Sequence, residues 1–310
     1  MKRPLPLWLP LWLPLRRLAL CAATILLLAG CASTWFSTLH HDHPLAGRVW
    51  DTHAGRFVEV QTAIDRAVAA RVVILGEIHD NAEHHRLQAE VLTALLRAGR
   101  RPVIAMEQFD REHQAALDAV RASGERDPER IADAGGFDRK GWHWPGYRPL
   151  LELAAANDLP ILAANLSRQS ARALMKTGKP ADGLALAPEA LQSALEQDIV
   201  VGHCGVRPPA TMLSAMVEAQ RARDAQMALT LGSAGERGAI LIAGVGHARR
   251  DRGVPAYVPA TMRKELLVVA FVEVEAGRSV PGAGFAGLYD LVWFTPRAAR
   301  EDPCKNVRMP

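Results

Sequence analysis

The feature that most constrains the fold is an alternation of short apolar runs with longer amphipathic stretches. The apolar runs are rich in Val, Ile, Leu and Ala and occupy residues 71–77, 102–109, 160–166 and 239–247. Runs that are apolar at nearly every position are typical of parallel strands buried on both faces of a sheet. Stretches with helical spacing accompany them, at residues 81–98, 111–122, 148–157, 170–175 and 211–231. The alternation predicts an α/β fold with three layers, α/β/α, around a mainly parallel sheet.

Two further strands are expected late in the chain, at residues 266–274 and 289–295. These strands come after the last strand–helix alternation in the chain, so we expect them at an edge of the sheet. Their direction there could be parallel or antiparallel. Residues 127–145 are rich in Gly, Asp and Trp and are interpreted as a loop. No internal repeat is visible, and residues 46–310 are interpreted as a single domain.

The first thirty residues have the organisation of a bacterial lipoprotein signal peptide. Basic residues are followed by an apolar run at 18–29, which is too short to span a bilayer but suits a signal segment. The run ends in Leu-Ala-Gly directly before Cys31, as in a lipobox. We therefore expect cleavage of residues 1–30 and attachment of acyl chains, palmitate among them, to Cys31. The alternative is an ordinary secretory signal with an incidental cysteine.

Acylation of Cys31 would hold the mature protein to a membrane. Each buried methylene contributes about 0.8 kcal/mol, so several chains give lasting attachment. Ala32, and not aspartate, follows the cysteine, which by resemblance to bacterial lipoproteins favours the outer membrane. Residues 31–45 are then expected to form a tether between the lipid anchor and the domain.

Removal of the first thirty residues changes the charge of the chain. The whole chain has 37 Lys and Arg against 33 Asp and Glu, and four of the bases but none of the acids lie in that segment. The mature protein would carry 33 bases and 33 acids and be formally neutral. Nucleic-acid binding needs an excess of basic side chains, so a nucleic acid is not expected as a partner.

The chain has four cysteines, of which one would be removed with the signal segment and another, Cys31, would be acylated. Two cysteines then remain in the domain. Cys204 and Cys304 would lie in an oxidising compartment, where two thiols tend to pair. We predict a Cys204–Cys304 disulfide that ties the C-terminal tail to the body of the domain. Two separate buried thiols are the alternative.

Polar residues follow the predicted strands at the ends that a parallel sheet brings to one edge. Glu77 and His79 follow the first strand, and Glu107 lies near the end of the second. His247 ends the fourth strand after a Gly-x-Gly turn, and Asn165 lies near the end of the third. Ligands of open α/β sheets bind beyond these ends, so His79, Glu107 and His247 could bind a divalent metal or act as acid and base, with Glu77 beside them. The alternative is that each residue only caps a helix or stabilises a turn.

The predicted helix at residues 211–231 carries a mixed face. Met216, Gln220, Arg223 and Met227 recur at helical spacing, and Asp224 lies beside them. A helix face that packs only into a core would be apolar throughout. Gln220 and Arg223 therefore indicate a polar cavity, although an internal ion pair of Arg223 would produce the same pattern.

A cluster of aromatic residues lies at positions 141–149. Trp142, Trp144 and Tyr147 occur there in a chain that has only three tyrosines. Such a cluster can form a flat wall for a planar ligand or a small satellite core. The sequence leaves both interpretations open.

Together these motifs resemble the ChaN family of iron-regulated haem-binding lipoproteins. The resemblance extends from about residue 45 to residue 304. It rests on GEIHDN at 76–81, EQFDR at 107–111, WxxY at 144–147, AANL at 163–166, HCG at 203–205, MxxxQxxRDxxMA at 216–228, AGVGH at 243–247 and DPC at 302–304. The wider superfamily contains the Tiki and TraB proteins and erythromycin esterase, some of which are metal-dependent hydrolases. The resemblance implies a related α/β fold.

The resemblance also implies that ferric haem is bound at the interface of a homodimer, with a tyrosine as the iron ligand. A tyrosinate is a hard anionic donor that suits ferric iron. Tyr147 is the first candidate and Tyr257 the second, whereas Tyr289 is interpreted as a strand residue. The candidate partners of the haem are His143, Arg148, His203, Gln220 and Arg223.

The sequence therefore leaves three roles open, the third of which is a scaffold that neither binds haem nor catalyses a reaction. The first is haem binding by an outer-membrane lipoprotein of iron uptake. The second is metal-dependent hydrolysis by His79, Glu107 and His247. No H-E-x-x-H helix and no G-x-S-x-G turn occurs in the sequence, which excludes the common zinc-protease and serine-hydrolase motifs.

Overall fold

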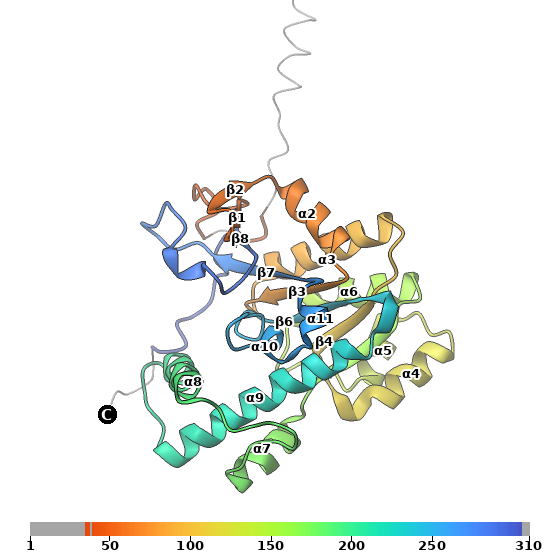
Figure 1. Ribbon diagram of the computed structural model, residues 1–310. Helices are drawn as coiled ribbons and strands as arrows, with labels where there is room; N and C mark the ends of the chain where they lie inside the picture. The colour runs from red at the N-terminus through yellow and green to blue at the C-terminus, as the bar shows by residue number, and fades with distance from the viewer. Residues whose placement is uncertain (1–34, 38, 306–310) are drawn as a thin grey trace, which may run out of the picture. The chain divides into compact units, whose positions relative to one another are not determined.

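The computed structural model describes residues 35–37 and 39–305. The predicted signal segment and Cys31 lie outside the described residues. From Phe36 onward the described chain forms one compact unit. Figure 1 shows a central sheet with helices packed on both sides of it. No helix among the described residues has both the length and the apolar character needed to cross a membrane.

The sheet has eight strands in the order β2-β1-β8-β7-β3-β6-β4-β5. Their bounds in chain order are β1 Val49–Asp51, β2 Arg56–Val58, β3 Val72–Glu77, β4 Val103–Asp110, β5 Ile161–Asn165, β6 Ala239–Gly244, β7 Leu266–Glu273 and β8 Leu291–Thr295. The six strands from β8 to β5 in that order are parallel. β1 pairs antiparallel with both β8 and β2.

Helices cover both faces of the sheet, as the uniformly apolar strands predict. The first face packs against α2 Val60–Ala69, α3 Ala82–Arg97, α4 Gln114–Ala122, α5 Pro128–Ala134 and α6 Trp144–Ala156. The second packs against α9 Ala210–Gly232, α10 Val254–Tyr257 and α11 Ala260–Arg263. The remaining helices, α7 Arg168–Thr177 and α8 Glu189–Gly202, pack on α9 (Figure 1).

Alternate residues of one strand enter different cores because successive side chains point to opposite faces. Val73 and Leu75 of β3 belong to the core under α2–α6, whereas Val72 and Ile74 belong to the core under α9–α11. All four are at most 1% exposed. The three-layer α/β/α architecture with a mainly parallel sheet is therefore confirmed.

The structure differs from the sequence-based expectation at the edges. The late strands β7 and β8 lie inside the sheet and are parallel to β3, while the antiparallel edge consists of the short strands β1 and β2. The expected loop at 127–145 contains α5, and α6 already begins at Trp144. Three-residue strands and short helices carry too few residues for a periodic pattern, which explains why they escaped prediction.

Part of the expected tether belongs to the domain. Leu39 forms a β-bridge with Arg297, and Leu45 is 2% exposed in the core under α9–α11. Residues 39–45 therefore pack on the body of the protein. The lower boundary of the domain lies before residue 39, and not at 46.

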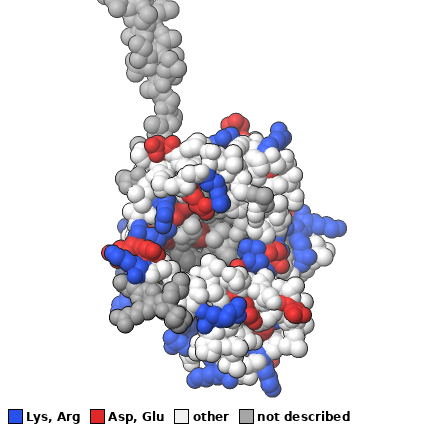
Figure 2. Space-filling view, turned by 90° about the vertical axis from the view of Figure 1, so that its left-hand side faces the viewer, with Lys and Arg blue, Asp and Glu red and all other residues white. Residues whose placement is uncertain are grey.

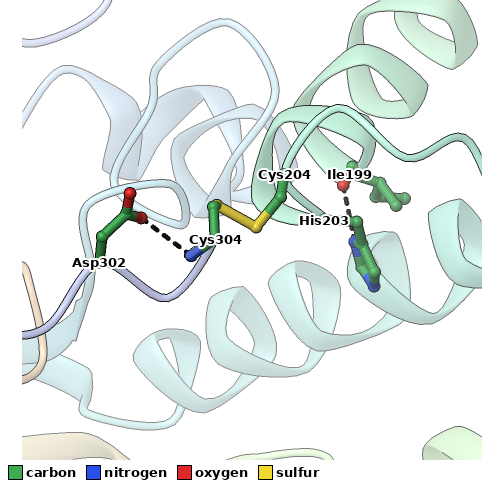
Figure 3. Close-up of a disulfide and its surroundings, with 5 residues drawn as sticks. All are labelled: Ile199, His203, Cys204, Asp302 and Cys304. Atoms are coloured by element: carbon green, nitrogen blue, oxygen red, sulfur yellow. Dashed lines mark hydrogen bonds between the residues drawn. A yellow bond between two sulfur atoms is a disulfide. The ribbon is translucent and has the colours of Figure 1, made fainter. Parts of the chain in front are cut away.

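The structure joins Cys204 and Cys304 by a disulfide, which is the predicted pairing. The bridge connects the turn after α8 to the C-terminal tail (Figure 3). It closes a loop with a sequence separation of 100 residues. Over the described residues drawn in Figure 2, basic and acidic side chains are interspersed, and this face has no continuous basic surface.

Candidate functional site

The carboxyl ends of β3, β4 and β6 bring their polar residues together. β3 pairs with β6 in a register that sets Glu77 opposite Gly244. His79, Glu107 and His247 all line one cavity of about 820 Å³, which we call the polar cavity. Its other walls include Gln108, Trp142, Asn165, Arg168, Gln220 and Arg223. The strand-end prediction thus identified residues that do meet in space.

Two histidines of this cavity, His79 and His247, are each oriented by a buried carboxylate. Nδ1 of His79 lies 2.9 Å from Oε1 of Glu77, and Nδ1 of His247 lies 2.7 Å from Oδ1 of Asp224. Burial alone would lower the pKa of His247, but Asp224 and Glu107 outweigh it and raise the pKa to about 9. Burial opposes protonation of His79 too, yet Glu77 and Glu107 raise its pKa above the ordinary value. The imidazole of His247 therefore favours the protonated form at neutral pH, and the pKa of His79 is shifted in the same direction.

Glycine is required at the end of β6 because the site is crowded there. A Cβ atom on Gly244 would lie 2.9 Å from Nε2 of His79. The Gly244 N–H donates to Oε2 of Glu107 at 2.7 Å, and Oε1 of that carboxylate lies 3.5 Å from Nε2 of His247. The AGVGH motif thus brings the backbone close enough to hold Glu107 between the two histidines.

Glu77 is the hub of the buried polar network under this cavity. It is 1% exposed and accepts hydrogen bonds from the Tyr147 hydroxyl, from Nε2 of Gln88 at 2.6 Å and from Nε2 of Gln108 at 3.3 Å. Burial by itself would raise its pKa. The charge of His85 and the hydrogen bonds from His79 and Tyr147 outweigh burial and lower the pKa of Glu77 to about 2. Glu77 is consequently ionised inside the domain.

Two neighbouring histidines, His84 and His85, are buried beside Glu77. His84 is 0% and His85 is 2% exposed. Nδ1 of His84 accepts the Ile78 N–H at 2.8 Å, and burial lowers the pKa of His84 to about 3. Both residues lie on α3, where the ring of His85 packs against Tyr147 of α6 and the ring of His84 contacts Phe271 of β7 and Thr295 of β8.

The structure contradicts Tyr147 as a ready iron ligand. Its side chain is 0% exposed, and its hydroxyl donates to Glu77. Burial and the charge of Glu77 raise the pKa of Tyr147 far above its ordinary value, so the tyrosinate is strongly disfavoured. The aromatic cluster belongs to the core under α2–α6: Tyr147 is a member of that core, Trp142 and Trp144 pack against it, and Trp142 also lines the polar cavity. The WxxY motif therefore supports Glu77 and does not form a ligand wall.

The other residues that the sequence suggested as haem ligands or partners, Arg148, His143 and Tyr257, do not line the polar cavity. Arg148 is exposed and pairs with Glu152 at 3.0 Å. His143 is exposed and lines an apolar groove beside α2 and α3. Tyr257 is half-buried in α10 and does not line the polar cavity or the cavity described next.

A second cavity of about 580 Å³ lies beside the first, between α8, α9 and the turn after β6; we call it the α8–α9 cavity. Gln220, Arg223 and His247 line both cavities, so the two are neighbours. Its apolar wall includes Met175, Leu195, Ile199, Met216 and Val245, and its polar wall includes His203, Asp224, Arg249, Arg252 and Tyr289. The mixed face of α9 thus does face cavities, as the sequence indicated, except that Met227 is buried in the core.

Sequence reasoning missed the tyrosine of this second cavity. Tyr289 precedes β8, is 6% exposed and directs its hydroxyl towards the Val245 carbonyl at 3.4 Å. Burial raises its pKa to about 12, against the lowering effect of Arg249. The expectation of a strand from residue 289 onward concealed it; Tyr289 belongs to the core under α9–α11 and also lines the α8–α9 cavity.

Arg223 differs from the other two arginines of the α8–α9 cavity. Arg249 binds Asp251 and Arg252 binds Asp198, each through two nitrogens. Arg223 donates to Oε1 of Gln220 at 2.8 Å, and no carboxylate within the described part of the chain pairs with it. A guanidinium that lines a cavity and forms no ion pair within the described part of the chain is suited to an anionic group of a ligand.

The metal-site hypothesis for His79, Glu107 and His247 gains no support. Across residues 35–37 and 39–305, no group of three or more His, Cys, Asp or Glu side chains is arranged to hold a metal ion. The same residues retain the geometry for proton transfer.

Comparisons with known proteins agree with this architecture. A family model described as haem-binding uptake, Tiki superfamily, ChaN matches residues 63–258. A solved structure described as cofacial heme binding to ChaN of Campylobacter jejuni is similar in fold, with 23% identity, a TM-score of 0.66 and coverage of 79% of this chain and 95% of that one. The type III effector HopBA1 matches with 17% identity and a TM-score of 0.44 over 76% of this chain and 93% of that chain. No curated protein matches.

Proposed function

Because the chain belongs to the ChaN family of haem-binding uptake proteins in the Tiki superfamily, we propose that it binds ferric haem in the α8–α9 cavity. One observation carries this proposal. The cavity joins an apolar wall to a guanidinium without a carboxylate partner and to a tyrosine, Tyr289. A haem needs an apolar surface for the macrocycle, cations for its propionates and a donor atom for iron, so these residues fit the group.

Each residue has a separate part in this proposal. Met216, Leu195 and Ile199 provide the apolar contact, and Arg223 pairs with a propionate. Tyr289 supplies the phenolate oxygen, since it lines the cavity while Tyr147 is enclosed by the core. The long 3.4 Å contact of its hydroxyl with Val245 costs little to break.

Titration with hemin tests the proposal. Purified protein is expected to shift the Soret band, and Tyr289→Phe is expected to weaken haem affinity by about 10- to 100-fold. Tyr147→Phe and Tyr257→Phe serve as matched controls and should keep the wild-type spectrum. A Tyr289→Phe protein that binds like the wild type would remove Tyr289 as the ligand, and a wild type that leaves the hemin spectrum unchanged would refute haem binding.

A homodimer and a lipid anchor complete the proposal. Val201 on α8 and Met212 on α9 are 66% and 52% exposed, and they flank the residues that line the α8–α9 cavity. Association of two copies through this apolar face would place the haem at their interface. Acylation at Cys31 would hold the dimer to the outer membrane, where it would serve iron uptake.

Hydrolysis in the polar cavity is the second candidate function. It is favoured by the two carboxylate-bound histidines that face one space, since an imidazolium at His247 can donate a proton and Glu107 can accept one. Turnover of carboxylic esters or peptides should then fall by at least about 100-fold in His247→Ala. The His143→Ala variant, which changes an exposed residue outside the cavity, should keep full activity. Absence of turnover in the wild type on both substrate classes would eliminate this function.

A further inference from the structure

A mostly apolar groove of about 710 Å³ runs along α3, with α2 and α6 as its other walls; we call it the α3 groove. Its lining includes Val60, Ile64, Ala89, Ala94, Pro149 and Trp293. It shares no lining residue with the polar cavity or the α8–α9 cavity. α3 packs on one face of the sheet and α9 on the other, and in Figure 1 α2 and α3 lie above the sheet while α8 and α9 lie below it. The α3 groove is therefore a separate site.

The groove extends over the whole length of α3. The residues of α3 that line it begin with Ala82 and end with Arg97, which are the first and last residues of the helix. A helix rises about 1.5 Å per residue, so this distance is about 22 Å. One leaflet of a bilayer has a hydrocarbon layer of about 15 Å, half of the full core. The groove is therefore long enough for an extended acyl chain.

Two large apolar side chains of the groove are open to solvent. Phe36 is 68% exposed and Val60, the first residue of α2, is 40% exposed. Apolar surface in water is unfavourable, and an exposed apolar patch that adjoins a groove is typical of an interaction site. This surface therefore favours a partner with an apolar part.

The backbone at Phe36 is held in place by a buried carboxylate. Glu83 lies in the first turn of α3 and is 0% exposed. Its Oε1 accepts the backbone N–H groups of Phe36 and of Ser37, the latter at 3.0 Å. The Ser37 hydroxyl also donates to the carbonyl oxygen of Arg297. These bonds fix the start of the compact unit beside the α3 groove.

The expected lipid anchor is close to this point along the chain. Cys31 precedes Phe36 by five residues. Five residues span at most about 18 Å even when fully extended. An acylated Cys31 would therefore keep Phe36, and with it the groove, within this distance of the bilayer.

The groove also has a positively charged end. Arg97 is exposed in the last turn of α3, and no carboxylate within the described ranges forms an ion pair with it. Arg86, earlier in the same helix, differs because it pairs with Glu83 and Glu90. A guanidinium donates two parallel N–H groups to a phosphate. An apolar groove that ends in such a guanidinium matches a lipid with an acyl chain and an anionic head group.

We propose that the α3 groove binds an anionic phospholipid of the membrane, with one acyl chain along α3 and the phosphate beside Arg97. This inference rests on the proposed lipid anchor, which would bring the groove to the bilayer, and it does not depend on haem. Phe36 and Val60 would enter the head-group layer. Because α9 packs on the other face of the sheet, the α8–α9 cavity would face away from the bilayer and stay accessible.

Vesicle flotation tests the anionic head group. The chain of residues 32–310 lacks Cys31 and contains the whole compact unit, so it reports on the groove without the anchor. It should bind vesicles of equal parts phosphatidylcholine and phosphatidylglycerol more tightly than vesicles of phosphatidylcholine alone. Arg97→Glu should bind the mixed vesicles about 5- to 30-fold more weakly, because it reverses a charge at the bilayer surface. Arg172→Glu, at an exposed position of α7, is the matched control and should bind like the wild type.

Fluorescence of Trp293 tests whether an acyl chain enters the groove, which this residue lines. Phospholipids with brominated acyl chains quench tryptophan on contact, so part of the quenching in the wild type should be lost in Trp293→Phe. Ala94→Glu places a charged side chain in the groove and should abolish the same part. Ala119→Glu, at an exposed position of α4, is the matched control and should be quenched like the wild type. Arg97→Glu changes an exposed residue and keeps the test valid if Ala94→Glu does not fold.

Three results would overturn the inference. The first is equal binding of the wild type and Arg97→Glu to the mixed vesicles. The second is vesicle binding without quenching of Trp293, which would reduce the groove to a surface that touches the bilayer. The third is quenching by a dissolved brominated fatty acid but not by the vesicles, which would assign the groove to a free fatty acid.

The anchor on which the inference rests is tested separately. The full chain, expressed in bacterial cells with labelled palmitate, should incorporate the label, and Cys31→Ser should not. Absence of the label from the wild type would refute the anchor. Lipid binding by residues 32–310 would stand or fall on the vesicle experiments alone.

Discussion

Glu77→Gln is expected to lower the free energy of unfolding by about 4 kcal/mol, because it breaks a fully buried charged network. Glu77 accepts hydrogen bonds from four side chains: His79, Gln88, Gln108 and Tyr147. A glutamine of the same shape turns one acceptor oxygen into an N–H₂ group that faces donors. The buried donors that lose their acceptor are then neither hydrated nor hydrogen-bonded, which destabilises the folded state. Urea unfolding monitored by circular dichroism measures the change.

The dependence of the free energy of unfolding on pH, measured below pH 4.5, provides an independent check on the ionised state of Glu77. Its pKa is about 2 in the folded protein, against an ordinary value of 4.5. A lowered folded-state pKa gives stability that is present above pH 4.5 and is lost as the pH falls towards 2, in total about 3 kcal/mol. Glu77→Gln should lack this part of the loss, since it has no carboxyl group at that position.

Glu152→Gln is the matched control for the Glu77 experiment. Glu152 lies on α6, is exposed and pairs with Arg148. Surface ion pairs contribute about 0–1 kcal/mol, so this variant should unfold nearly like the wild type. Equal stability of Glu77→Gln and Glu152→Gln would contradict the assignment of Glu77 as the hub of the network.

The second large effect is expected from removal of the disulfide. Cys204 and Cys304 close a loop with a sequence separation of 100 residues, and a bridge of that span stabilises a protein by about 5 kcal/mol through the unfolded chain. Cys304→Ser should therefore unfold at a clearly lower urea concentration than the wild type. Cys204→Ser should lose the same amount, and the double variant should lose no more, because all three lack one and the same bridge.

Reduction of the wild type covers the case in which a cysteine variant does not fold. The reduced protein is chemically unaltered elsewhere, and its urea midpoint should match that of Cys304→Ser. A stability change below about 1 kcal/mol after full reduction would show that the bridge does not constrain the unfolded chain as the loop length requires.

The architecture could be predicted because it depends on local pattern. β3, β4, β5 and β6 are apolar over most of their length, with polar residues towards their carboxyl ends. A parallel sheet of such strands is buried only when helices cover both of its faces. The same logic placed His79, Glu107 and His247 at one edge, since parallel strands end at the same side. β1 and β2 could not be predicted, because three residues are too few to establish an alternation.

The environments of the tyrosines show what cannot be predicted from sequence patterns alone. A motif indicates which residue types occur together, but not whether a hydroxyl is enclosed. Tyr147 was the first candidate for a ligand, and the packing of α6 on α3 buries it against Glu77. Tyr289 was interpreted as part of a strand, and the actual start of β8 at Leu291 leaves it at a cavity wall.

The sequence by itself predicted the class of fold, the edge of the sheet that carries polar residues and, with two separate thiols as the alternative, the pairing of Cys204 with Cys304. These follow from side-chain periodicity, from the direction of parallel strands and from the number of available thiols. Only the tertiary structure decided which aromatic and imidazole groups face a cavity. That choice depends on contacts between elements far apart in the chain, such as α6 against α3 and α8 against α9, and no local pattern encodes those contacts.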